Sequence, residues 1–99
     1  MKITVLGDLL YDCFIWAPRL PRMGETVTGD RNGFYAGGKG GNQAYAMGRL
    51  GGRVSMLGSV GNDTYGEKLC ANLASAGVDV SCVRRAQAVS TGMAVIGVT

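Results

Sequence analysis

The chain has 99 residues, of which 46% are hydrophobic and 17% are charged, and its net charge is +3. These values indicate at most one globular domain, and the weak, dispersed positive charge argues against nucleic-acid binding. The lack of histidine and the wide spacing of the three cysteines argue against a zinc site and favour reduced thiols in the cytoplasm. No apolar run has the length of a membrane span or of a signal peptide, so neither is expected.

Short apolar runs predict strands in the first third of the chain. Residues 2–6 are β-branched and apolar, and they predict a buried first strand. Residues 10–17 predict a second strand. Residues 25–36 predict two short strands or one bent strand, with a turn at Asn32-Gly33.

Helices alternate with strands in the remainder of the chain. Small and apolar residues at helical spacing predict a first helix, and a polar cap of the Asn-Asp-Thr type predicts a second one. The predicted elements in order are a helix at 42–50, a strand at 53–60, a helix from about 62 to 76, a strand at 78–83 and a strand at 91–99. Alternation at this spacing indicates an α/β fold with a parallel sheet, from which residues 10–36 form a small β excursion.

A glycine run, Gly37-Gly38-Lys39-Gly40-Gly41-Asn42, precedes the first predicted helix and accounts for part of a total of 17 glycines. Bare backbone, a helix N-terminus and a lysine together suit an oxygen-rich ligand. A Walker-type phosphate loop is disfavoured, because Gly40 stands where a Ser or Thr would bind Mg²⁺. A dinucleotide-binding turn is disfavoured too, because the first strand is followed by more strand and not by a helix.

The glycine run and the Gln43-Ala44 pair that follows Asn42 resemble the first signature of the ribokinase-like (phosphofructokinase B) carbohydrate kinases. Three other segments resemble that family in the same order, and they are the lid segment at 21–29, a turn and helix start at 58–66, and a lid strand at 90–94. The resemblance covers essentially residues 1–99. It implies part of a three-layer α/β/α sandwich with a small β lid, formed by segments at about 10–36 and 90–99.

The resemblance also implies a sugar site between the α/β body and the lid. Asp12 matches the family's sugar-binding aspartate, and a carboxylate can accept hydrogen bonds from two adjacent hydroxyls. Gly38 would bring main-chain groups close to the sugar, and Lys39 and Asn42 match side chains that bond to hydroxyls. Each residue also has a structural explanation, since Asp12 could bond a turn, Lys39 could be exposed, and Asn42 could be a helix cap.

Three further positions qualify this interpretation. The ribose-specific members carry an asparagine two residues before the strand aspartate, where this chain has Leu10, which argues against ribose. Fructose, a sugar acid, a phosphorylated hexose and a nucleoside remain open as substrates. Asp8 is compatible with either the site or a turn cap, and Asp63 is expected to be a helix cap only.

The family's ATP-binding part, with its aspartate base and anion hole, would lie beyond Thr99, as would most of the groups that bind ATP and Mg²⁺. We therefore predict that the chain supplies the sugar-binding side and the lid of an ATP-dependent sugar kinase, and that it is inactive alone. The alternative is a non-catalytic sugar-binding or dimerisation module. Exposed lid strands favour a homodimer under either hypothesis.

Overall fold

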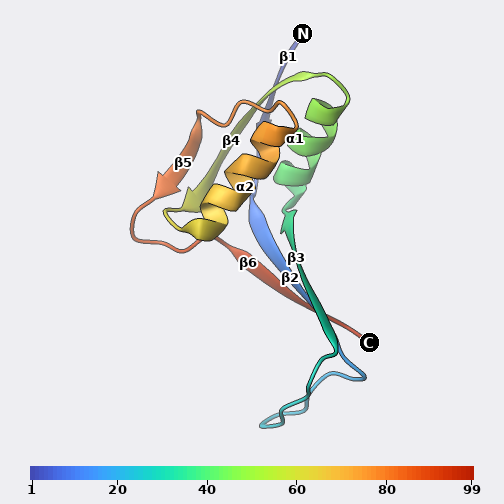
Figure 1. The fold of residues 1–99 in the computed structure, drawn as a ribbon. Helices are drawn as coiled ribbons and strands as arrows, with labels where there is room; N and C mark the ends of the chain where they lie inside the picture. Colours follow the sequence, from blue (N-terminus) through green and yellow to red (C-terminus); the bar gives the residue numbers. More distant parts are fainter.

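The computed structural model describes residues 1–99 and contains two three-stranded sheets and two helices (Figure 1). The elements in chain order are β1 (Lys2–Leu6), β2 (Leu10–Trp16), β3 (Arg31–Gly37), α1 (Lys39–Arg49), β4 (Arg53–Gly61), α2 (Thr64–Ser75), β5 (Val83–Ala86) and β6 (Met93–Val98). We call β1, β4, β5 and the two helices the body, and β2, β3, β6 and the loop at 17–30 the lid.

The body is a parallel sheet in the order β1-β4-β5, as the alternation of elements predicts. Side chains on one face of β1 and β4 are buried against the helices, and Met56, Leu69 and Leu73 are the largest side chains that are almost completely enclosed. Burial of such side chains contributes about 1.5–3 kcal/mol each. This core fixes the positions of the carboxyl ends of β1 and β4. In sheets of this type, ligands bind beside these strand ends.

Helices cover only one face of the body sheet. Helices α1 and α2 pack beside each other on that face, and Figure 1 shows both in front of the strands. On the opposite face, the paired residues Leu6 and Leu57 are exposed by 83% and 38%. The chain thus holds the sheet and one helical layer of the α/β/α sandwich that the sequence predicts.

The lid is a separate sheet in the order β3-β2-β6, with β2 antiparallel to β3 and parallel to β6. It projects from the body toward the C-terminus of the chain (Figure 1). The chain crosses between body and lid three times, at residues 7–9, 38 and 87–92. The segments predicted as lid at 10–36 and 90–99 contain the three strands of this sheet.

Residues 25–36 differ in part from the prediction. Only Arg31–Gly37 forms a strand, and the expected turn at Asn32-Gly33 lies inside it, opposite Ile15 and Phe14. A Cβ at Gly33 would lie 2.8 Å from the ring of Tyr35. This glycine therefore makes room for an aromatic neighbour, and the chain turns back earlier, in the loop at 17–30.

Two other boundaries also differ. Residues 78–82 form no strand beyond an isolated bridge at Asp79, and the strand lies instead at Val83–Ala86. Helix α1 starts at Lys39 and not at Asn42, because Gly40 and Gly41 are helical and buried. Intrinsic propensity disfavours glycine in helices, so tertiary packing decides this helix start.

Candidate functional site

Helix α1 begins at a bare stretch of backbone. Its N-cap residue, Gly38, has a φ of 88°, which is a conformation that favours glycine. The Gly38 N–H makes no hydrogen bond within the chain. A Cβ at Gly40 would lie 2.7 Å from the Cα of Gly7, so only glycine allows this close approach to the end of β1. The helix start thus presents a free N–H and the positive end of its dipole.

Asp8 holds this helix start against the end of β1. Its Oδ1 accepts a hydrogen bond from the Gly40 N–H at 2.9 Å, and its carbonyl accepts one from the Gly41 N–H at 3.0 Å. The Gly40 hydrogen bond, with the nearby Lys39 charge as a smaller cause, lowers the pKa of Asp8 below its ordinary value. Of the two roles that the sequence leaves open, the structure shows helix capping, and Asp8 also lines the hollow described below.

Asp12 lies on β2 with its side chain against the end of β3. A Cβ at Gly37 would lie 2.6 Å from the Asp12 Cγ, so the carboxylate occupies the space that the missing side chain leaves. Gly37 directly precedes the N-cap of α1, and the fold thereby brings a half-buried lid carboxylate to the helix start. Leu10 lies two residues before Asp12 on the same face of β2, opposite Gly37.

Lys39 and Asn42 both belong to the first turn of α1, and both are exposed. Asn42 is not the N-cap, because that position belongs to Gly38; its N–H donates to the Gly38 carbonyl at 2.9 Å. The Asn42 side chain borders a narrow gap that Gly37 also lines. Asp12 and Lys39 line none of the hollows on the surface. What Asp12, Gly38, Lys39 and Asn42 have in common is their position around the start of α1.

A hollow of about 450 Å³ lies at the carboxyl ends of β1, β4 and β5. In open parallel sheets, ligands bind in the crevice outside these strand ends. Asp8 lines this hollow, as do the residues just before β6, so the ends of the body strands and the segment that leads into the lid meet around it. The lining residues are Gly7, Asp8, Leu9, Ser59, Val60, Gly61, Ala86, Val89, Ser90, Thr91 and Gly92.

A buried hydrogen-bond cluster closes one side of this hollow. Thr91, which is only 4% exposed, donates from its Oγ1 to Asp63 Oδ1 at 2.6 Å and from its N–H to Asp63 Oδ2 at 2.9 Å. Asp63 also caps α2 by accepting from the Gly66 N–H at 2.8 Å. The expectation that Asp63 is only a cap is therefore wrong. The cap has a sequence signal, whereas nothing in the sequence indicates contact between residues 28 positions apart.

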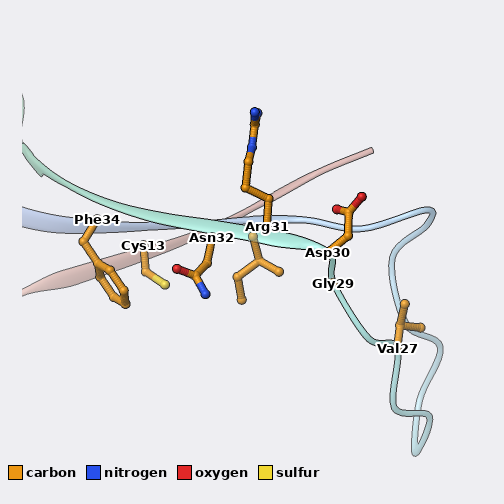
Figure 2. A pocket seen from close by; sticks show the side chains of 8 residues that line it. Cys13, Val27, Gly29, Asp30, Arg31, Asn32 and Phe34 are labelled. Carbon is orange, nitrogen blue, oxygen red and sulfur yellow. The ribbon is translucent and has the colours of Figure 1, made fainter.

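The outer face of the lid carries a second hollow, of about 460 Å³. Figure 2 shows Cys13, Asn32 and Phe34 pointing from the sheet to one side, whereas Arg31 points to the other. Phe34 is 52% exposed, and Val95, in the same row across the sheet, is 72% exposed. The face opposite Asp12 is thus an exposed and largely apolar surface.

The structure shows no cluster of side chains that would hold a metal ion through protein ligands alone. The 99 residues contain no group of three or more His, Cys, Asp or Glu side chains that could hold a metal ion. No helix has the length and apolar character that crossing a membrane requires.

Comparison with known proteins places this geometry in a family. The sequence profile of the pfkB family carbohydrate kinases matches residues 1–99. The chain belongs to this family. A ribokinase of Schizosaccharomyces pombe is 40% identical over 102 residues, which cover 97% of this chain and 32% of the relative.

Solved structures of the family have the same fold. Arabidopsis thaliana ribokinase, solved with ribose and ATP, has a TM-score of 0.91 at 32% identity, and the match covers 97% of this chain and 31% of that one. Ribokinase from Cryptococcus neoformans var. grubii serotype A, solved with ADP, has a TM-score of 0.86 at 38% identity, with 97% and 30% covered. The chain spans about a third of the length of the relatives it matches, and its fold is that part of the ribokinase-like sandwich and lid.

Proposed function

We propose that the chain forms the sugar-binding side and the lid of an ATP-dependent carbohydrate kinase in the cytoplasm. The observation that carries this proposal is the position of the Asp12 carboxylate, which lies against Gly37 beside the start of α1, where the Gly38 N–H is free. A carboxylate accepts from two neighbouring hydroxyls, and a free backbone N–H donates to a hydroxyl oxygen. Membership of the pfkB family supports the same reaction class.

In this proposal, four residues bind the acceptor sugar. Asp12 accepts from the sugar hydroxyls from the lid side, and the Gly38 N–H donates to them from the body side. Lys39 and Asn42 are exposed on the first turn of α1, where they add further donors within reach of the same ligand.

Transfer of a phosphoryl group requires positioning and charge stabilisation around the γ-phosphate. As the family resemblance implies, we assign the binding of ATP and Mg²⁺ to the family's C-terminal part. The 99-residue chain alone is therefore expected to bind sugar without phosphorylating it. ATP turnover by the purified chain with a sugar panel would refute this expectation.

Sugar binding is tested by NMR titration of the purified chain with D-ribose, D-fructose and D-gluconate. We expect amide shifts at the start of α1 and along β2, and their loss in Asp12→Asn. The matched control is Asp30→Asn, which removes an exposed lid carboxylate outside the site. Equal titration curves for the wild type and Asp12→Asn would refute the assigned role of Asp12.

Leu10 provides a separate test of the acceptor. An apolar side chain beside Asp12 offers no hydrogen bond, and a site built to bond a hydroxyl discriminates strongly against ligands without one. We therefore expect Leu10→Asn to raise the affinity for ribose and to leave that for fructose less affected. Unchanged ribose affinity in this variant would show that residue 10 does not face the ligand.

A second candidate function is self-association through the outer face of the lid. The exposed Phe34 and Val95 surface, with the hollow of Figure 2, is apolar on a free-standing sheet, and such surfaces usually mark interfaces. A second copy of the chain is the proposed partner, because the same face on two copies forms a closed two-fold contact. Sedimentation analysis should show a dimer that Val95→Asp converts to a monomer.

A further inference from the structure

Two sequence motifs outside the sugar site meet in the structure. The first motif runs from the end of β4 into the first turn of α2 and contains Gly61, Asp63 and Gly66. The second motif lies just before β6 and contains Thr91. The Gly61 N–H donates to Thr91 Oγ1 at 2.9 Å, and that same hydroxyl donates to Asp63 Oδ1 at 2.6 Å. One buried hydroxyl therefore joins β4, the N-cap of α2 and the lid. We call these four residues the latch.

The glycines of the latch make room for it. A Cβ at Gly61 would lie 2.8 Å from Asp63 Oδ2, and a Cβ at Gly66 would lie 3.1 Å from Thr91 Oγ1. A Cβ at Gly66 would also meet the Gly61 carbonyl oxygen. A side chain at either position would push Thr91 away from Asp63. The contacts of the latch therefore explain why Gly61 and Gly66 are glycines.

The latch is connected to the sugar site through one strand. Gly92, which follows Thr91, accepts a hydrogen bond from the Tyr11 N–H at 2.9 Å. From there β6 runs parallel to β2, and Ala94 lies opposite Asp12. The position in which Thr91 is held on the body therefore sets the position of Asp12 relative to the start of α1.

Resting on the proposed function, we infer that Asp63 and Thr91 are positioning residues for sugar binding, which hold the lid strands so that Asp12 meets the acceptor at the start of α1. They do not contact the sugar. Their effect passes through Gly92 and the pairing of β6 with β2. A latch of this kind couples sugar affinity to the junction of body and lid.

Three variants of the purified chain test the inference. Thr91→Val keeps the shape but removes the hydroxyl, and Thr91→Ser restores it. The control is Asp79→Asn, which removes a carboxylate that accepts from the Ser81 N–H at 2.9 Å in the body, away from the lid. Sugar affinity is measured by NMR titration with ribose and fructose, and hydrogen exchange of the Tyr11 amide reports the lid junction independently of any sugar.

We expect Thr91→Val to reduce Tyr11 amide protection and the affinity for whichever sugar the wild type binds, each about tenfold, as the loss of one buried hydrogen bond predicts. Thr91→Ser should restore both, and Asp79→Asn should change neither. Unchanged Tyr11 protection in Thr91→Val overturns the latch. Reduced protection with unchanged sugar affinity overturns the positioning role. A wild type that binds no tested sugar refutes the proposed function, and the exchange result then still decides whether the latch holds the lid.

Discussion

The two helices of the chain begin in opposite ways. Helix α2 is capped by its own Asp63 and carries Glu67 in its first turn, so its N-terminus is closed by carboxylates from its own segment. Helix α1 has a glycine cap, no acidic residue in its first turn, and Lys39 in the first position. Its capping carboxylate, Asp8, comes from the end of β1. The comparison indicates that one helix start fastens the lid, whereas the other stays accessible to a ligand.

The largest expected effect comes from adding side chains at both helix starts. Alanine at a helical glycine normally stabilises by about 1 kcal/mol. At Gly40 and Gly66, however, the new Cβ would meet backbone atoms. We expect Gly40→Ala and Gly66→Ala each to lower the free energy of unfolding by about 1–3 kcal/mol, measured by urea denaturation. Gly52→Ala is the control, because a Cβ there would lie 3.0 Å from the Met47 carbonyl oxygen and is less crowded than at Gly40 or Gly66. It should lower the free energy of unfolding by less than the other two substitutions.

If either helical variant were as stable as the wild type, the close approach at that helix start would not be required. Stabilisation of Gly66→Ala alone would separate the two helices and would locate the tight packing at α1 only.

A smaller effect is expected from acid. Hydrogen bonds from Thr91 lower the pKa of Asp63, and the bond from Gly40 lowers that of Asp8. A carboxyl whose pKa is lower in the folded chain stabilises it above the ordinary pKa, and this contribution is lost as the pH falls through the lowered value. Urea denaturation between pH 7 and pH 2 should therefore show falling stability below about pH 4.

Substitution distinguishes the two carboxylates. Asp63→Asn should flatten the acid dependence more than Asp8→Asn, since Asp63 accepts three hydrogen bonds from side-chain and backbone donors and Asp8 accepts one with its side chain. A steeper acid profile in Asp63→Asn would contradict the assigned cause of its lowered pKa.

The smallest effect on stability is expected at the accessible helix start. Lys39 is exposed and makes no ion pair in the chain. Lys39→Gln should change the free energy of unfolding by less than about 0.5 kcal/mol, while the NMR titration should show weaker sugar binding. Arg49→Gln, an exposed basic residue at the other end of α1, is the matched control for the change in charge. Equal sugar affinity in the two variants would remove Lys39 from the site.

The sequence predicts the order of elements because hydrophobic pattern and local caps are local signals. The Asp63 cap, the strand at 2–6 and the strand at 53–60 are found in this way, and the structure confirms them with small changes at the ends. The β-branched run near 78–83 is misassigned, since a β-branched pattern does not say which residues reach a neighbouring strand. Asp79 makes only an isolated bridge to Ser55 of β4, and continuous pairing with β4 begins at Val83.

The site is less predictable because it depends on contacts between distant segments. Gly40 and Asp8 are 32 residues apart, and Thr91 and Asp63 are 28 apart. Neither pair has a local signal, and helix propensity even argues against a helix at Gly40. The resemblance to a kinase family predicts that Asp12 and the glycine run belong to a site, but only the structure shows that Asp12 lies against Gly37.

The three passages of the chain between body and lid limit how this protein can be engineered. A lid inserted through two neighbouring passages could be excised or exchanged as a single cassette. Here β2 and β3 come from one stretch of sequence and β6 from another, with much of the body encoded between them. A chimera that takes its lid from a relative must therefore replace two separate stretches at once. It must also keep a partner for Thr91 at the position of Asp63, because this contact holds the second stretch on the body.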